Sequence, residues 1–380
     1  MSRNRAVIGA WCLVLTLTGC QAAASPSATQ TALATQTALA TQTALATQTA
    51  SELTSPSASI QPGSSGVIYY LSPNLMDEWQ AGSKLLIEQG GEALGYEVRT
   101  LNANNVASEQ ANQMDTAISQ HPKAIIVAAV DSSTIIPSVE EAKAAGIPVV
   151  VYDREITGTK VDFTSVTGTQ KMGQIAADQI GPLLIKKYGT ARGTVLEVMG
   201  DLGDSYTVGI DQGFRAEMTK DFPNVNVIVK NSPGWTAEAA ADAVDSQLTT
   251  NKNIDIIFLH SEVRAPAVIT VLQAHNLKAG DITLVGTDGT PTGLAAIRDG
   301  WMLETVQQPV PQQVAGIWQY MSDVLAKKTF SPGSVDIGGL TSELTLESWG
   351  PTLTLPGGVI DATNVNDPSL WGNLKVIVGS

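Results

Sequence analysis

Cysteine is almost absent from this chain of 380 residues, which contains only Cys12 and Cys20. Both precede residue 21, so no disulfide can crosslink the rest of the chain, and a chain this long can bury enough surface to fold without one. Histidine is scarce as well: His121, His260 and His275 lie far apart and match no zinc-binding spacing. We therefore expect a fold held by packing alone, with no metal centre.

Basic residues are also in short supply, with 22 Lys and Arg against 36 Asp and Glu and a net charge of −14. Such an acidic chain is not expected to bind nucleic acid, or to bind anionic lipid by charge. Catalytic signatures are missing too: the sequence has no glycine-rich dinucleotide loop, Walker loop, serine nucleophile elbow or zinc-protease motif. We predict a protein that is not an enzyme and takes no cofactor.

The N-terminus has the features of an export signal. Arg3 and Arg5 precede an apolar run, residues 6–17, that is too short to span a bilayer comfortably and that ends in Leu-Thr-Gly-Cys20. This ending resembles a bacterial lipobox, in which the cysteine receives a lipid and becomes the first residue. We expect residues 1–20 to be a lipoprotein signal peptide and Cys20 to anchor the protein at the extracytoplasmic face of the cell membrane. An anchor that is never cleaved is the alternative.

Residues 21–66 are of a different composition. The hexapeptide Ala-Thr-Gln-Thr-Ala-Leu begins at Ala28 and recurs at Ala34 and Ala40, and Ser and Pro flank the repeats. Large aliphatic residues are too sparse to build a core, which predicts a disordered tether, although Ala, Leu and Gln also permit a short helical repeat.

From Val67 onward, strand and helix patterns alternate. The predicted strands are Val67–Leu71, Glu97–Leu101, Ala124–Ala129, Pro148–Tyr152, Thr194–Met199, Val225–Val229, Ile254–Leu259, Thr283–Gly286 and Leu303–Val306. The predicted helices are Glu78–Ala93, Ser108–Gln120, Thr134–Ala145, Thr169–Tyr188, Tyr206–Lys220, Thr236–Leu248, Ala265–His275, Pro291–Asp299 and Pro311–Lys327. Continuous β-branched strands between amphipathic helices indicate parallel sheets covered on both faces, and their number predicts two α/β lobes.

Polar residues follow several of these strands at the point where each strand ends. Asp153 and Arg154 come directly after one strand, and Ser261, Asp288 and Gln308 follow three others. In sheets of this kind ligands bind beyond the carboxyl ends of the strands, so these side chains are candidate ligand contacts. Asp153 and Arg154 could instead form a surface pair, and Asp288 could cap a helix.

Four segments give the chain a family resemblance. Residues 77–80 (DEWQ), 145–154 (AGIPVVVYDR), 234–235 (GW) and 285–291 (VGTDGTP) resemble, in order, segments of the periplasmic sugar-binding proteins of the ribose and xylose type. The resemblance covers about residues 67–328. It implies a type I periplasmic-binding-protein fold, and a partner ABC permease to which a small xylose- or ribose-like sugar is delivered. It also implies that the protein is a monomer.

The resemblance further implies two doubly wound parallel-sheet lobes joined by a hinge near residues 167 and 308. We expect an N-terminal lobe of residues 67–166 plus about 289–307. The C-terminal lobe is expected to comprise residues 167–288 plus about 308–350, followed by a C-terminal tail, 351–380.

Carried onto this sequence, the family site comprises Asp77, Glu78, Trp79, Asp153, Arg154, Asp204, Tyr206, Trp235, Ser261, Glu262, Asp288 and Gln308. Indole rings can cover the C–H faces of a sugar, while carboxylates and a guanidinium can each bind adjacent hydroxyls. The chain departs from the family at two places. The arginine of the ribose type is missing from residues 204–208, and Ser261-Glu262 stands where the family has Asn-Asp.

The predicted site is acidic, with six carboxyl groups against one evident cation, Arg154. An anionic ligand would be repelled, so a neutral polyol or an amine-bearing ligand is favoured. Two other functions remain open: a receptor that feeds a membrane sensor, and an enzyme on the same fold. A sugar-responsive repressor is excluded, because an export signal and a tether occupy the place of a DNA-binding head.

Overall fold

A computed structural model describes residues 66–251 and 253–375. The predicted signal peptide, the lipidation site Cys20 and residues 21–65 of the predicted tether lie outside this part of the chain, and Gly66 begins the first strand. Within the described residues, every helix is too short or too polar to cross a membrane.

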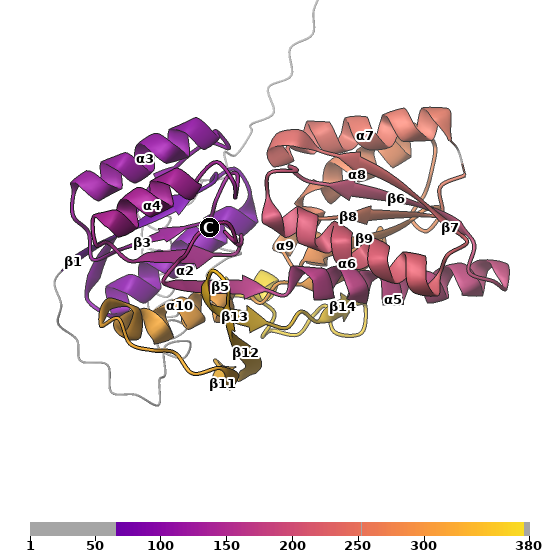
Figure 1. Ribbon diagram of the computed structural model, residues 1–380. Helices are drawn as coiled ribbons and strands as arrows, with labels where there is room; N and C mark the ends of the chain where they lie inside the picture. The colour runs from indigo at the N-terminus through magenta and orange to yellow at the C-terminus, as the bar shows by residue number, and fades with distance from the viewer. Residues whose placement is uncertain (1–65, 252, 376–380) are drawn as a thin grey trace, which may run out of the picture. The chain divides into compact units, whose positions relative to one another are not determined.

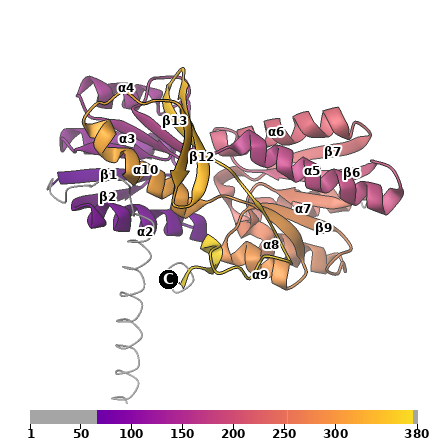
Figure 2. The same cartoon turned by 90° about the horizontal axis from the view of Figure 1, so that it is seen from below.

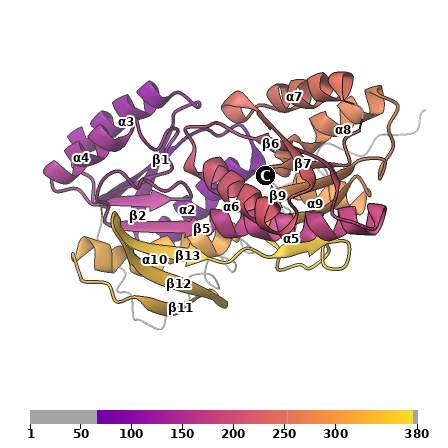
Figure 3. The same cartoon turned by 45° about the vertical axis from the view of Figure 1, so that its right-hand side comes forward.

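The N-terminal lobe is built on an eight-stranded sheet with the order β11-β12-β13-β5-β4-β3-β1-β2 (Figure 1). Its strands are β1 Gly66–Ser72, β2 Tyr96–Asn102, β3 Ala124–Val127, β4 Val149–Tyr152, β5 Phe163–Thr167, β11 Gly333–Ile337, β12 Leu340–Glu347 and β13 Gly350–Leu355. β1 to β5 and β13 run parallel, and β11 and β12 add an antiparallel edge beside β13 (Figure 3).

Four helices cover this sheet on its two faces: α2 Glu78–Ala93, α3 Ala107–Ser119, α4 Ile136–Ala144 and α10 Val310–Leu325. Leu86 and Ile87 of α2 share one buried cluster with Ile317 and Trp318 of α10, and Figure 2 shows these two helices on the same lobe. α3 and α4 contribute to a separate cluster on the other face. Two covered faces explain why β1, β3 and β4 read as continuous apolar runs.

The C-terminal lobe is built on a six-stranded sheet with the order β14-β10-β9-β8-β6-β7. Its strands are β6 Gly193–Met199, β7 Val225–Asn231, β8 Ile256–Leu259, β9 Thr283–Asp288, β10 Met302–Gln307 and β14 Val359–Asp361. Its helices are α5 Thr169–Tyr188, α6 Ser205–Asp221, α7 Ala237–Thr250, α8 Ala265–Ala274 and α9 Pro291–Arg298. The predicted class, two doubly wound α/β lobes, is confirmed, with mostly parallel rather than purely parallel sheets.

Glycines allow α5 and α6 to pack at backbone contact. A Cβ atom on Gly213 would overlap the carbonyl oxygen of Gln170, and one on Gly173 would overlap that of Ile210. This packing holds the N-terminal part of α6, which carries Tyr206 of the expected site, against the N-terminal part of α5. The chain enters the C-terminal lobe at the start of α5.

The expected division into lobes is wrong after residue 288. β10 pairs with β9 and so belongs to the C-terminal lobe, whereas α10 packs on the N-terminal lobe. The expected C-terminal tail is in fact structural: β13 pairs with β5, and β14 pairs with β10. The chain therefore crosses between lobes three times among the described residues, at 167–169, 307–310 and 355–359.

Neither β5 nor any of β11 to β14 is predicted by the sequence patterns. β5 reads Phe-Thr-Ser-Val-Thr, and its buried hydroxyl-bearing residues hide it from a search for apolar runs. β11 and β12 alternate exposed with buried residues at the sheet edge, and a two-residue glycine turn, Gly338-Gly339 with positive φ at both, joins them.

Candidate functional site

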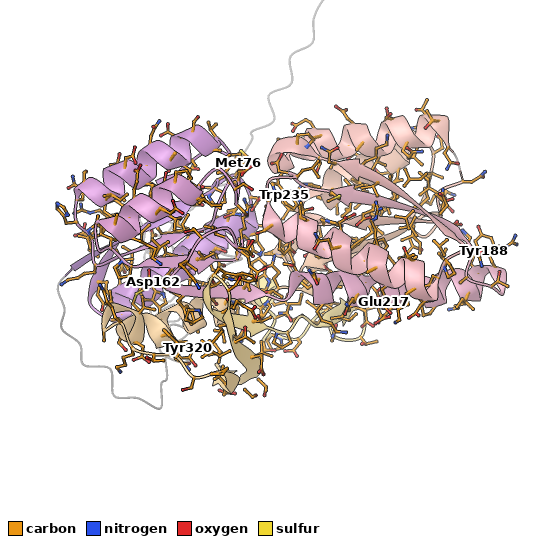
Figure 4. The ribbon with its side chains drawn as sticks, viewed as in Figure 1. Met76, Asp162, Tyr188, Glu217, Trp235 and Tyr320 are labelled. Atoms are coloured by element: carbon orange, nitrogen blue, oxygen red, sulfur yellow. The ribbon has the colours of Figure 1, made fainter. Side chains whose placement is uncertain are left out.

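The main candidate site is a small cavity of about 30 Å³ beyond the carboxyl ends of the strands. Its lining comes from both lobes: Asn74, Asp77, Trp79, Gln80, Asp153, Arg154, Tyr206, Trp235, Ser261, Arg264, Asp288 and Gln308. Figure 4 shows Trp235 and Tyr188 at opposite ends of the C-terminal lobe, and Trp235 marks the end at which the cavity lies.

The N-terminal lobe presents an acid, a guanidinium and an indole ring. Asp153 follows β4 directly and adopts a left-handed φ of 65°, a conformation that costs free energy in a residue other than glycine. Trp79 begins α2 and stacks on Tyr152, with ring centroids 5.8 Å apart and planes inclined by 18°. Asp77 caps the same helix by accepting a 2.9 Å hydrogen bond from the backbone N–H of Gln80.

The C-terminal lobe presents a second indole ring against a second guanidinium. Trp235 ends the loop after β7 with a φ of 54°, and the guanidinium of Arg264 lies 4.4 Å from the centre of its ring. Arg264 donates from Nε and Nη2 to the carbonyl oxygen of Trp235, which fixes both groups. Nearby, the Tyr206 hydroxyl donates to Asp288 Oδ1 at 2.8 Å, and Gln308 Nε2 donates to the same oxygen at 3.3 Å.

Five polar atoms on cavity-lining residues are buried and have no hydrogen-bond partner among the described residues. They are Trp79 Nε1, Gln80 Oε1, Asp153 Oδ1, Arg154 Nε and Gln308 Oε1. Leaving a buried polar group unpaired costs about 1–3 kcal/mol, so buried groups nearly always have partners. A ligand with several hydrogen-bonding groups would supply them.

Burial dominates the pKa values of Asp153 and Asp288, the two carboxyl groups that line the cavity and are almost fully buried. Desolvation raises the pKa of Asp153 to about 8; Arg154 opposes this shift, whereas Asp204 and Asp288 add to it. Desolvation likewise raises the pKa of Asp288 to about 7, against hydrogen bonds from Ser261 and Tyr206. Both carboxyl groups therefore hold protons more tightly than they would in water.

The two lobes are in direct contact around the cavity. Arg154 Nη2 lies 3.0 Å from Asp204 Oδ2 across the lobes, and both side chains are almost fully buried. Asn105 Nδ2 donates to the carbonyl oxygen of Gly234 at 2.9 Å, and the N–H of Thr292 donates to Glu78 Oε1 at 2.8 Å. These bonds link loops near the cavity, so the structure represents a closed arrangement of the lobes.

Residues 68–329 match the family described as the periplasmic binding protein domain. The chain belongs to this family. The resemblance seen in the sequence is thereby confirmed at family level, as is the prediction that the protein is not an enzyme.

Several members of the periplasmic binding protein family are similar to this chain. The D-apiose import binding protein of Paraburkholderia graminis is 29% identical over 57% of this chain and 68% of its own length. The ribose import binding protein of Bacillus subtilis is 30% identical over 59% of this chain and 70% of its own length. The periplasmic binding component of the arabinose ABC transporter from Shewanella sp. ANA-3 has the same fold, with a TM-score of 0.69 and 18% identity over 82% and 97% of the two chains.

Nine of the twelve ligand contacts expected for this periplasmic binding protein line the cavity: Asp77, Trp79, Asp153, Arg154, Tyr206, Trp235, Ser261, Asp288 and Gln308. Their contact with a ligand stays a prediction. The other three expected contacts lie elsewhere.

Glu78, Asp204 and Glu262 do not line the cavity, because each is occupied by the protein itself. Glu78 bonds the start of α9 across the lobes. Asp204 caps α6 through Oδ1 and contacts Arg154 and Trp235 through Oδ2. Glu262 is fully buried and accepts hydrogen bonds from Thr290 and Thr305.

Three lining residues were not predicted: Asn74, Gln80 and Arg264. Gln80 is the last residue of the DEWQ segment, and Arg264 lies on the short helical turn Glu262–Arg264 that follows Ser261. Arg264 corrects the expectation of a single evident cation at the site. The described residues contain no group of three His, Cys, Asp or Glu side chains able to hold a metal ion.

Proposed function

We propose that this protein is the extracytoplasmic sugar-binding component of an ABC importer, held at the membrane by a lipid on Cys20. Its ligand would be a monosaccharide of xylose or ribose size. The observation that carries the proposal is the cavity in which two indole rings from opposite lobes accompany buried acids and guanidinium groups.

The chemistry of the cavity suits a polyhydroxylated ring. Trp79 and Trp235 offer flat apolar surfaces for the C–H faces of a sugar. Asp153 and Arg154 offer an unpaired acceptor and an unpaired donor for neighbouring hydroxyls. Relatives named for the import of D-apiose and ribose support a small sugar as the ligand class.

Binding and release would depend on the crossing segments between the lobes. In an open form the carboxyl ends of the strands would be accessible, and closure on a sugar would bury it between the lobes. A permease that favours the closed form would then distinguish loaded from empty protein. The predicted tether would let the monomeric body reach the permease while Cys20 stays in the membrane.

A thermal-shift screen of pentoses, hexoses, amino sugars and polyols against the purified protein tests this proposal. A ligand at 100 times its Kd stabilises the folded state by about 2.7 kcal/mol, which raises the Tm measurably. Calorimetry on any hit should give one site per chain, and deletion of the gene should abolish uptake of that sugar. No shift with any sugar or polyol would contradict the proposal.

A further inference from the structure

Carboxyl groups outnumber cations in and around the cavity. Asp77, Asp153 and Asp288 line it, and Arg154 and Arg264 are its only lining cations among the described residues. Both guanidinium groups are already engaged with other parts of the protein. Neither guanidinium donates a hydrogen bond to Asp77, Asp153 or Asp288.

Arg264 gives its hydrogen bonds to backbone oxygens rather than to carboxylates. Its Nε and Nη2 donate to the Trp235 carbonyl at 3.1 and 3.0 Å, and its Nη1 donates to the Ser261 carbonyl at 3.3 Å. No carboxylate oxygen of the described residues lies within ion-pair distance of it. These hydrogen bonds hold the Arg264 guanidinium against the ring of Trp235.

Arg154 is likewise engaged away from Asp153. Its Nη2 pairs with Asp204 at 3.0 Å, and its Nη1 donates to the Ala129 carbonyl at 2.9 Å. Only Nε approaches Asp153, at 3.8 Å, and it makes no hydrogen bond. One guanidinium is therefore shared between two buried carboxylates, and Asp204 has the closer contact.

Asp153 is left as a buried acid that needs a cationic or strongly donating partner. Its side chain is 4% exposed, and its Oδ1 accepts no hydrogen bond from residues 66–251 or 253–375. The groups around it are Arg154 beside it, the carboxyl groups of Asp204 and Asp288 from the opposite lobe, and the buried neutral amide of Gln313 on α10. The hydroxyls of Tyr152 and Tyr206 lie in the same buried region and carry no charge.

We infer that the ligand is an amine-bearing sugar or polyol whose ammonium group binds Asp153. The inference rests on the proposed function, because it names the class of ligand for the same cavity. An ammonium group has three donors and no acceptor, which suits the unpaired Asp153 Oδ1, and the unpaired amide oxygens of Gln80 and Gln308 belong to residues that line the same cavity. The adjacent ring of Trp79 favours a cation as well.

Proton release should accompany the binding of such a ligand. With the pKa of Asp153 at about 8 in the empty site, this carboxyl is mostly protonated at pH 7. An incoming ammonium favours the carboxylate, lowers its pKa and displaces the proton. Affinity for the amine should therefore rise between pH 6 and pH 8, as long as the ligand keeps its own charge, whereas a neutral sugar should show no such rise.

Calorimetry on matched ligand pairs tests the inference. We would compare 1-amino-1-deoxyribitol with ribitol, 1-amino-1-deoxyxylitol with xylitol, and glucosamine with glucose, each in two buffers of different ionisation enthalpy. We expect at least one amine to bind tenfold or more tightly than its neutral counterpart at pH 7, with release of protons. Asp153→Asn should abolish that preference and the proton release, whereas Asp245→Asn, at an exposed position of the C-terminal lobe, should change neither.

The outcomes separate the inference from the proposed function. If neutral sugars bind as tightly as their amines in every pair, the inference is overturned and the proposed function stands. If an amine preference persists in Asp153→Asn, the role of Asp153 is overturned. If neither neutral sugars nor amines bind, both the inference and the proposed function fail.

Discussion

Arg154 in the N-terminal lobe and Asp204 in the C-terminal lobe form a buried ion pair of 3.0 Å, so a single charged contact spans the two halves of the site. The pair exists only while the lobes are closed, because its partners follow strands of different sheets. Removing one member of a buried pair is costly, since it leaves the other charge without compensation. The energetic effect should therefore appear in closure rather than in folding.

Asp204→Asn should make closure less favourable. We expect ligand affinity to fall tenfold or more, which corresponds to about 1.4 kcal/mol, and the ligand-free protein to expand in small-angle X-ray scattering. Asp245→Asn removes a charge from an exposed contact with His275 and is the matched control. Unchanged affinity and an unchanged radius of gyration would show that the pair does not govern closure.

Substitutions at Asp153, Arg154 and Trp79 should weaken binding without unfolding the protein. A hydrogen bond to a charged group is worth about 1.5–3 kcal/mol, so Asp153→Ala and Arg154→Lys should each reduce affinity about tenfold or more. Trp79→Ala should reduce it by removing the stacked face. Calorimetry with melting curves checks this, and near-normal affinity in all three variants would place the ligand elsewhere.

Gly213→Ala should destabilise the C-terminal lobe by separating α5 from α6. The added methyl group would overlap the backbone oxygen of Gln170, which cannot move without shifting the helix. Overpacking of this kind costs about 1–3 kcal/mol, visible as a lower Tm. Ala216→Ser, on the exposed side of α6, is the control, and equal melting temperatures for the two variants would refute close packing at Gly213.

Stability of the ligand-free protein should fall as the pH rises from about 4.5 to 7. Burial, reinforced by Asp361 opposite it on β14, raises the pKa of Glu304 from 4.5 to about 7. A carboxyl with a higher pKa in the folded state than in the unfolded state stabilises the fold while it is protonated, and this contribution disappears as the pH passes upward through the folded value.

For one such group, the free energy of unfolding should fall by at most about 1.4 kcal/mol per pH unit. Chemical denaturation at pH 5, 6, 7 and 8 measures it. Glu304→Gln should be more stable than the natural protein at pH 8 and nearly equal to it at pH 4.5. A slope that is the same with and without the substitution would assign the pH dependence to other groups, such as Asp153 and Asp288, whose raised pKa values act in the same direction.

Replacement of Cys20 tests the proposed anchor. Cys20→Ala should prevent lipid attachment, so that the protein is either released from membranes or left unprocessed. Labelling with a radioactive fatty acid, followed by membrane fractionation, measures both outcomes. A natural protein that is soluble and never labelled would exclude a lipid anchor.

The periodic part of the fold could be predicted from the sequence, whereas the sheet edges could not. Helices such as α2 and strands such as β4 follow from local apolar patterns that burial on two faces imposes. β13 could not be placed, because its partner β5 is distant in sequence and itself rich in threonine and serine. The assignment of β10 to the N-terminal lobe was wrong for the same reason, because strand pairing is a long-range property that a local sequence pattern does not record.

The site shows a similar division. Asp153 and Asp288 could be located because they directly follow buried strands, where the fold itself brings side chains together. The sequence alone could not show that Ser261 lines the cavity and that the next residue, Glu262, does not. The Glu262 carboxylate points inward, where it accepts hydrogen bonds from Thr290 and Thr305. Arg264 was missed because its role depends on the Trp235 ring, which lies on a different loop.

The third crossing between lobes also constrains the order in which the molecule can be completed. During synthesis β5 is made early, but β13, its neighbour in the sheet, is made only after residue 349. β10 likewise waits for β14, which begins at Val359. Until that last segment has been made, both half-finished sheets present an open edge of unpaired backbone groups. One late stretch of chain pairs with both β5 and β10, so neither sheet is complete until residues 350–361 have been made.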